Sequence, residues 1–205
     1  MVSEKLFRAG TPDLATRLPS KLWPRLVRAG ANLGLPELLL HQLTPGSALL
    51  LFSAPAETDP TATVDGQLYA RAKDRNLTVA ALESIDEQFA IFENLTDAQA
   101  CAALAETLDE IAAGRPDDRK LLATYATGDE RAVLAVVQAE FAKSAANRAL
   151  AEPLLYHRNR LMVDRLSPRL GAGGAFVAIG VAHLIGPKSV IELLRARGYK
   201  ITRVP

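Results

Sequence analysis

Residues 175–204 read AFVAIGVAHLIGPKSVIELLRARGYKITRV, and this stretch decides the predicted fold. Its first part, 176–182, is continuously apolar and rich in β-branched residues, which is typical of a strand covered on both faces in a parallel sheet. Gly186 and Pro187 then open a helix that ends at Gly198, and residues 199–204 alternate into a second strand. Two strands joined by a helix predict a right-handed βαβ crossover.

The rest of the chain is mostly helical in its pattern. A third strand is predicted at 77–82, where Thr78 and Val79 favour extended backbone. Apolar spacing and capping residues predict helices at 64–75, 83–92, 96–113, 116–125, 129–141 and 148–166. We therefore expect a helix-rich α/β fold with a small, mostly parallel sheet flanked by many helices. Residues 1–205 would form a single domain, with 1–60 as a helical lead-in of weaker pattern.

Composition excludes several classes of function. Apolar residues make up 49% of the 205, which is enough for a core, and 24 Lys and Arg balance 23 Asp and Glu. This balance gives no electrostatic surface for nucleic acid. No stretch reaches the roughly 20 apolar residues of a transmembrane helix. Residues 1–10 are followed by no apolar segment, so they are not a signal peptide as written. The single cysteine, Cys101, excludes an internal disulfide.

His183 is the first candidate site residue. It lies just after a predicted strand and just before a predicted helix, where ligands gather in open α/β sheets. Gly180 would permit close approach of a ligand, and Gly186 and Lys188 lie where free N–H groups at the helix start would hold an anion. From its position alone, His183 is a metal ligand, a general base or a structural histidine bonded to backbone.

Arg158 is the second candidate. It lies near the middle of the apolar face of the helix predicted at 148–166, and Asn159 lies at the edge of that face. A buried arginine needs a carboxylate, carbonyl groups or a ligand. Glu83, at the end of a predicted strand, and Asp65, at the opening of a predicted helix, are acids that would pair with Arg158 or share a metal with His183. For Asp65 alone, a helix cap is the simpler interpretation. A structural ion pair and a site role both remain open for Arg158.

These residues also carry a resemblance. Residues 176–186, FVAIGVAHLIG, followed by LLRARGYKITRV at 193–204, resemble the C-terminal signature of the TraB/PrgY/GumN family, whose Gly-x-x-His element falls on Gly180 and His183. The Arg158–Asn159 pair resembles the family's Arg-Asn motif in the preceding helix. Residues 64–65 and 82–84 resemble its Val-Asp and Leu-Glu-Thr regions. The resemblance is collinear from about 64 to 204.

The resemblance implies an α/β fold and a metal-dependent peptidase or hydrolase, because the related Tiki proteins are regarded as proteases that use two Gly-x-x-His motifs and acidic residues. It implies His183 as a metal ligand, Glu83 as an acidic ligand or base, and Arg158 and Asn159 as residues that order the site or bind substrate. Mn²⁺, Co²⁺ or Zn²⁺ would activate water to attack a peptide carbonyl.

One family feature is absent. The first Gly-x-x-His, which lies on an N-terminal strand in the family, is not found, so the chain is expected to begin after that region and after two strands of the sheet. An inactive enzyme, or a non-catalytic binding or regulatory module of the same fold, is therefore the alternative. The bare sheet edge would favour a homo-oligomer. Localisation is not predicted, since family members are often exported or membrane-associated.

Overall fold

The computed structural model describes residues 6–7, 13–54, 59, 61–114 and 119–204. These residues belong to two compact units. The first unit comprises Met1–Val79 and Ser84–Pro116, and the second comprises Ala80–Glu83 and Asp117–Pro205. The second unit is therefore assembled from two separate stretches of chain.

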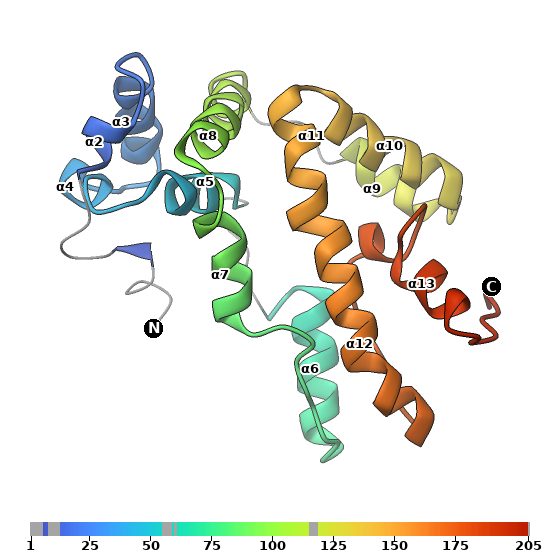
Figure 1. The fold of residues 1–205 in the computed structure, drawn as a ribbon. Helices are drawn as coiled ribbons and strands as arrows, with labels where there is room; N and C mark the ends of the chain where they lie inside the picture. Colours follow the sequence, from blue (N-terminus) through green and yellow to red (C-terminus); the bar gives the residue numbers. More distant parts are fainter. Residues whose placement is uncertain (1–5, 8–12, 55–58, 60, 115–118, 205) are drawn as a thin grey trace. The chain divides into compact units, whose positions relative to one another are not determined.

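The first unit is built from helices in its described part (Figure 1). They are α2 (Leu14–Arg17), α3 (Trp23–Asn32), α4 (Glu37–Leu40), α5 (Pro45–Ser53), α6 (Val64–Asp74), α7 (Ile85–Glu93) and α8 (Asp97–Ala112). The predicted capping box is present at the start of α8, where Thr96 accepts from the Gln99 N–H and Gln99 accepts from the Thr96 N–H. A second capping box starts α7 at Ser84 and Glu87. Such caps contribute about 1 kcal/mol each.

The core of the first unit lies around α5 and α8. Phe52 and Leu104 are fully buried there. A Cβ at Gly46 would lie 2.1 Å from the Phe92 carbonyl oxygen, so α5 and α7 meet backbone to backbone at this glycine. Burial also raises the pKa of the Cys101 thiol on α8. A raised pKa keeps the thiol protonated.

The second unit is arranged around one long helix. This helix consists of α11 (Ala145–Ala151), a π-helical segment η1 (Glu152–Tyr156) and α12 (His157–Ala172), as Figure 1 shows in orange. The remaining elements are α9 (Arg119–Ala126), α10 (Glu130–Ala142), the 3₁₀ turn η2 (Val181–His183) and α13 (Val190–Ala196). The helix predicted at 148–166 is confirmed, and it extends beyond both predicted ends.

The core of this unit joins α12 to α13. Its buried residues are Met162, Val163, Leu166, Val190 and Leu194. Partly buried side chains from the non-helical segments pack against them, among them Leu82, Ile179, Tyr199 and Ile201. The segments 80–83, 175–180 and 199–204 therefore use part of their apolar surface to cover helices.

The predicted α/β class is wrong for the part of the chain that the structure describes. Residues 77–82, 176–182 and 199–204 form no strand, and no described segment forms a sheet or a βαβ unit. An apolar, β-branched pattern reports that side chains prefer burial, but a strand also needs a neighbour that completes its ladder of main-chain hydrogen bonds. Here the burial comes from helices, which offer no such ladder. Where the helices do not reach, Phe176 stays 81% exposed.

Two other predictions concern the ends and the membrane. Residues 13–54 of the predicted lead-in form helices α2 to α5 joined by short turns, whereas 1–5, 8–12, 55–58 and 60 lie outside the described residues. The question of a signal peptide at 1–10 falls mostly on residues outside that range. Within the described ranges, none of the helices has the length and apolarity needed to cross a membrane.

Candidate functional site

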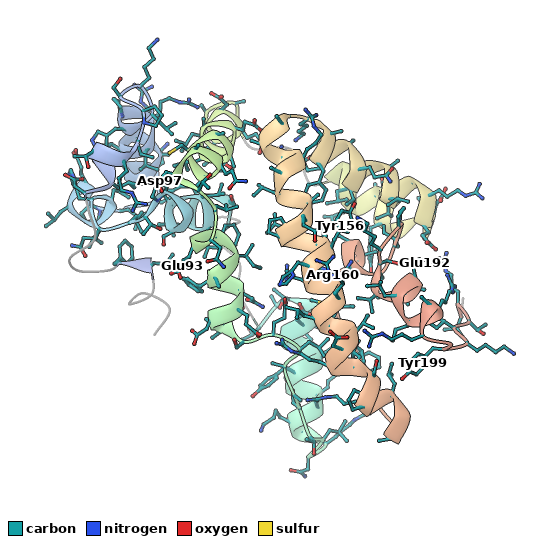
Figure 2. The ribbon with its side chains drawn as sticks, in the orientation of Figure 1. Glu93, Asp97, Tyr156, Arg160, Glu192 and Tyr199 are labelled. Atoms are coloured by element: carbon teal, nitrogen blue, oxygen red, sulfur yellow. The ribbon has the colours of Figure 1, made fainter. Side chains whose placement is uncertain are left out.

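The site begins at an irregular turn in the long helix of the second unit. Pro153 lies inside this helix, and a proline there removes a main-chain donor and disturbs the normal hydrogen-bond ladder. The helix contains a π turn at this point, in which the His157 N–H donates to the Glu152 carbonyl. Such turns are frequent at functional sites. Arg158 and Asn159 follow directly, on the same helix as Tyr156 and Arg160 in Figure 2.

Arg158 is paired with Glu83. Its Nε donates to Oε1 at 2.8 Å and one terminal nitrogen donates to Oε2 at 2.6 Å, while the other terminal nitrogen donates to the Leu154 carbonyl at 3.1 Å. The side chains are 21% and 7% exposed, respectively. Arg165 also donates to the Leu82 carbonyl. Two arginines of α12 thus hold the segment 80–83 against this helix.

Asn159, rather than Arg158, is the deeply buried member of the pair. Its Nδ2 donates to the Lys188 carbonyl at 2.8 Å, and its Oδ1 lies 2.6 Å from Nδ1 of His183. The Lys188 carbonyl only accepts, so it must face the amide nitrogen of Asn159. The amide oxygen of Asn159 then faces the imidazole, and Nδ1 of His183 must carry the proton.

This contact fixes the tautomer of His183. With the proton on Nδ1, a neutral imidazole has its lone pair on Nε2. No described residue hydrogen-bonds Nε2. Burial lowers the pKa of His183, and the nearby Arg158 charge lowers it further, whereas Glu83 acts in the opposite direction. His183 is thus a neutral imidazole at pH 7, with Nε2 able to accept a proton or bind a ligand.

The backbone at Lys188, which hydrogen-bonds Asn159, has an unusual conformation. Lys188 has φ +60°, which side-chain-bearing residues rarely adopt, and its carbonyl accepts the Asn159 bond. Its ammonium lies 4.9 Å from the centre of the Tyr156 ring, within range of a cation–π interaction. Ser189 caps α13 by accepting from the Glu192 N–H. Strained backbone of this kind often accompanies functional sites.

Comparison with known protein families supports the resemblance that first drew attention to these residues. A model of the TraB/PrgY/gumN family matches residues 1–203. The chain belongs to this family. No curated protein and no solved structure matches it.

The other candidate residues of this TraB/PrgY/gumN member lie in different surroundings. Gly180 precedes η2, and its carbonyl accepts from the His183 N–H at 2.9 Å. Gly186 has φ +77°, and a Cβ there would lie 2.5 Å from a methyl group of Leu134. Asp65 lies in the first turn of α6 in the first unit, where Thr63 provides the cap. Asp65 is therefore not that cap, and it belongs to a different unit from Glu83, Arg158 and His183.

The possible metal ligands Glu83 and His183 do not by themselves complete a metal centre. A catalytic zinc takes three protein ligands. Here both carboxylate oxygens of Glu83 accept from Arg158, which leaves Nε2 of His183 as the open donor. Throughout the described ranges, no group of three or more His, Cys, Asp or Glu side chains is arranged to hold a metal ion. Metal binding by His183 and Glu83 stays a prediction from the resemblance.

Two features of the site were not predicted from the sequence. One is the π turn at Glu152–Tyr156, although a proline inside an otherwise helical pattern does signal an irregularity in the helix. The other is a cavity of about 260 Å³ between α10, the long helix and the residues after η2. Nothing in the local pattern of α10 indicated that Leu134, Val137 and Phe141 would line a cavity, because their spacing is that of any packed helix face.

Proposed function

We propose that this protein is a hydrolase of amide bonds in peptides, with His183 as the general base. The observation that supports the proposal is the hydrogen bond from His183 Nδ1 to Asn159, which leaves a lone pair on Nε2 of a neutral imidazole. In the proposed step, a water O–H bond breaks and its proton moves to Nε2. The water oxygen bonds to the substrate carbonyl carbon. The proton then passes to the leaving nitrogen as the C–N bond breaks.

The neighbouring residues have supporting roles in this proposal. Asn159 is a positioning residue, because it holds the tautomer and the ring orientation and is itself held by the Lys188 carbonyl. Glu83 and Arg158 neutralise each other and fix the segment 80–83 on α12. A divalent metal held by Nε2 would instead supply Lewis-acid activation of the water or carbonyl, and it would occupy the lone pair that the general base uses, so these two roles of His183 are alternatives. No step above depends on it.

Hydrolysis of a fluorogenic peptide library by the full-length chain tests the proposal, with and without added Mn²⁺, Co²⁺ or Zn²⁺. Removing a general base typically costs about 10²–10⁴ in rate, so His183→Ala should lose at least roughly 100-fold. His157→Ala is the control, since His157 is an exposed histidine at the start of α12, the helix that carries Asn159. Asn159→Ala should shift the pH profile of the remaining activity. Equal activity of the His183 and His157 variants would refute the proposal.

The second candidate is a non-catalytic peptide-binding module. It is favoured by the Glu83–Arg158 pair, because a carboxylate with both oxygens accepting from one guanidinium is a structural group rather than a base. This candidate predicts peptide binding with no hydrolysis under any metal condition. Activity that depends on His183 excludes it.

A further inference from the structure

The cavity in the second unit is lined mainly by apolar side chains. Helix α10 contributes Leu134, Val137 and Phe141, the π turn contributes Leu155, and Ile185 comes from the segment after η2. None of the described residues that line it is an aspartate or glutamate, and the one charged lining residue among them, Arg148, donates to the Ala142 carbonyl. An apolar site without a carboxylate favours an uncharged, apolar occupant and disfavours a lysine or arginine side chain.

The volume of the cavity limits its occupant. Cavities that hold drug-sized ligands have volumes of about 300–1,000 Å³, and this one, at about 260 Å³, is smaller. Three alanines, Ala142, Ala151 and Ala182, lie in its wall, and any larger residue at these positions would reduce it further. Gly186 packs against the lining residue Leu134, which a Cβ at Gly186 would displace. The space fits one bulky side chain rather than an extended ligand.

The cavity is physically connected to His183. Asn159 lines it and also hydrogen-bonds Nδ1 of His183. Ala182, the residue before His183, lines it as well. A molecule with one group in the cavity would therefore contact residues that adjoin His183, which is not itself among the lining residues. Tyr156, another lining residue, is labelled on the long helix in Figure 2. The α12 part of this helix carries Asn159.

We infer that this cavity is a specificity pocket that receives one leucine- or phenylalanine-sized side chain of the substrate, next to the bond presented to His183. The inference rests on the proposed function, because it names the substrate side chain selected at that site. Burial of each extra methylene group strengthens binding roughly four-fold. Leucine should then bind at least about ten-fold more tightly than alanine.

Binding, measured apart from catalysis, tests the inference. The probes are N-acetyl-leucine amide, N-acetyl-phenylalanine amide, N-acetyl-alanine amide and N-acetyl-lysine amide, titrated into the full-length chain and followed by ligand-observed NMR. Ala151→Leu fills the cavity, and Ala149→Leu is the matched control because Ala149 is exposed on the same α11. We expect Leu and Phe probes to bind, Ala and Lys probes to bind at least ten-fold more weakly, and only Ala151→Leu to abolish the preference.

Several outcomes would overturn the inference. If all four amides bind equally well, the cavity does not select a side chain. If Ala151→Leu keeps the preference for the Leu and Phe probes, they bind somewhere other than the cavity. Circular dichroism of both variants establishes that they fold. His183-dependent hydrolysis without a Leu or Phe preference would refute the pocket and leave the proposed function standing. Selective binding without hydrolysis would support the pocket and count against the hydrolase.

Discussion

Glu83→Gln should destabilise the second unit far more than the same change in an exposed ion pair. Glu83 is 7% exposed and accepts two hydrogen bonds from Arg158, which is 21% exposed. Removing one partner of a fully buried pair costs about 3–5 kcal/mol, because the other charge stays buried and unpaired. Arg158 keeps some contact with solvent and its bond to the Leu154 carbonyl. We therefore expect a loss of about 2–3 kcal/mol.

The comparison variant is Glu152→Gln, which breaks the pair with Arg160 on the same long helix. The Glu152 and Arg160 side chains are 55% and 48% exposed, and exposed pairs of this kind contribute little to stability. Thermal unfolding followed by circular dichroism at 222 nm measures both changes. For a chain of this size, 1 kcal/mol corresponds to about 2–4 °C in Tm. Glu83→Gln should thus lower Tm by roughly 4–12 °C, and Glu152→Gln by less than about 4 °C.

A double variant separates the charge from the packing. Glu83→Leu with Arg158→Leu removes both charges, and replacing a buried pair by apolar residues is often close to neutral. We expect the double variant to recover most of the stability that either single leucine variant loses. If Glu83→Gln and Glu152→Gln cost the same, or if the double variant is as unstable as the sum of the single ones, the Glu83–Arg158 pair does not hold the segment 80–83.

Three further results are expected. Because burial lowers the pKa of His183 below its unfolded value, the unfolded chain binds more protons, so wild-type stability should fall as pH drops below about 6.5, by at most about 1.4 kcal/mol per pH unit. Urea unfolding of His183→Gln should show a flatter pH dependence than His157→Gln, and identical slopes would contradict the assignment. Gly186→Ala should cost more in thermal unfolding than Gly198→Ala, because both have positive φ but only Gly186 also contacts Leu134; equal losses would argue against that contact. Phe176→Ser should weaken self-association about ten-fold by sedimentation, if the exposed ring drives it, and a monomeric wild type at all concentrations would exclude this.

The helices could be predicted because their signals are local. Thr96 and Gln99 sit three residues apart and cap α8 as expected, and Gly198, with positive φ, follows the end of α13. Capping and 3.6-residue spacing depend only on neighbours in the sequence. The strands could not be decided in this way, because a strand depends on a partner far along the chain. The prediction for residues 176–180 was therefore wrong on hydrogen bonding and mostly wrong on burial, since Ile179 is partly buried but Phe176 is 81% exposed.

The polar cluster was predicted in part. Arg158 needed a partner because of its place on an apolar helix face, and Glu83 provides one. The relative depths of Arg158 and Asn159 were not predictable, because the π turn at Pro153 changes the angle at which later side chains leave the helix. Likewise, the left-handed conformation of Lys188 follows from long-range contacts, since nothing in its own side chain favours it.

The two-part construction of the second unit affects how the chain can be divided. Glu83 and Arg158 are 75 residues apart in sequence, and much of the first unit lies between them and before them. A fragment that starts at residue 117 would keep α9 to α13 but would leave Arg158 without its carboxylate. Refolding must also close this long loop, whose entropy cost grows slowly with length. The segment 80–83 should consequently dock late, and a protease cut near it should release the helical remainder in a weakened form.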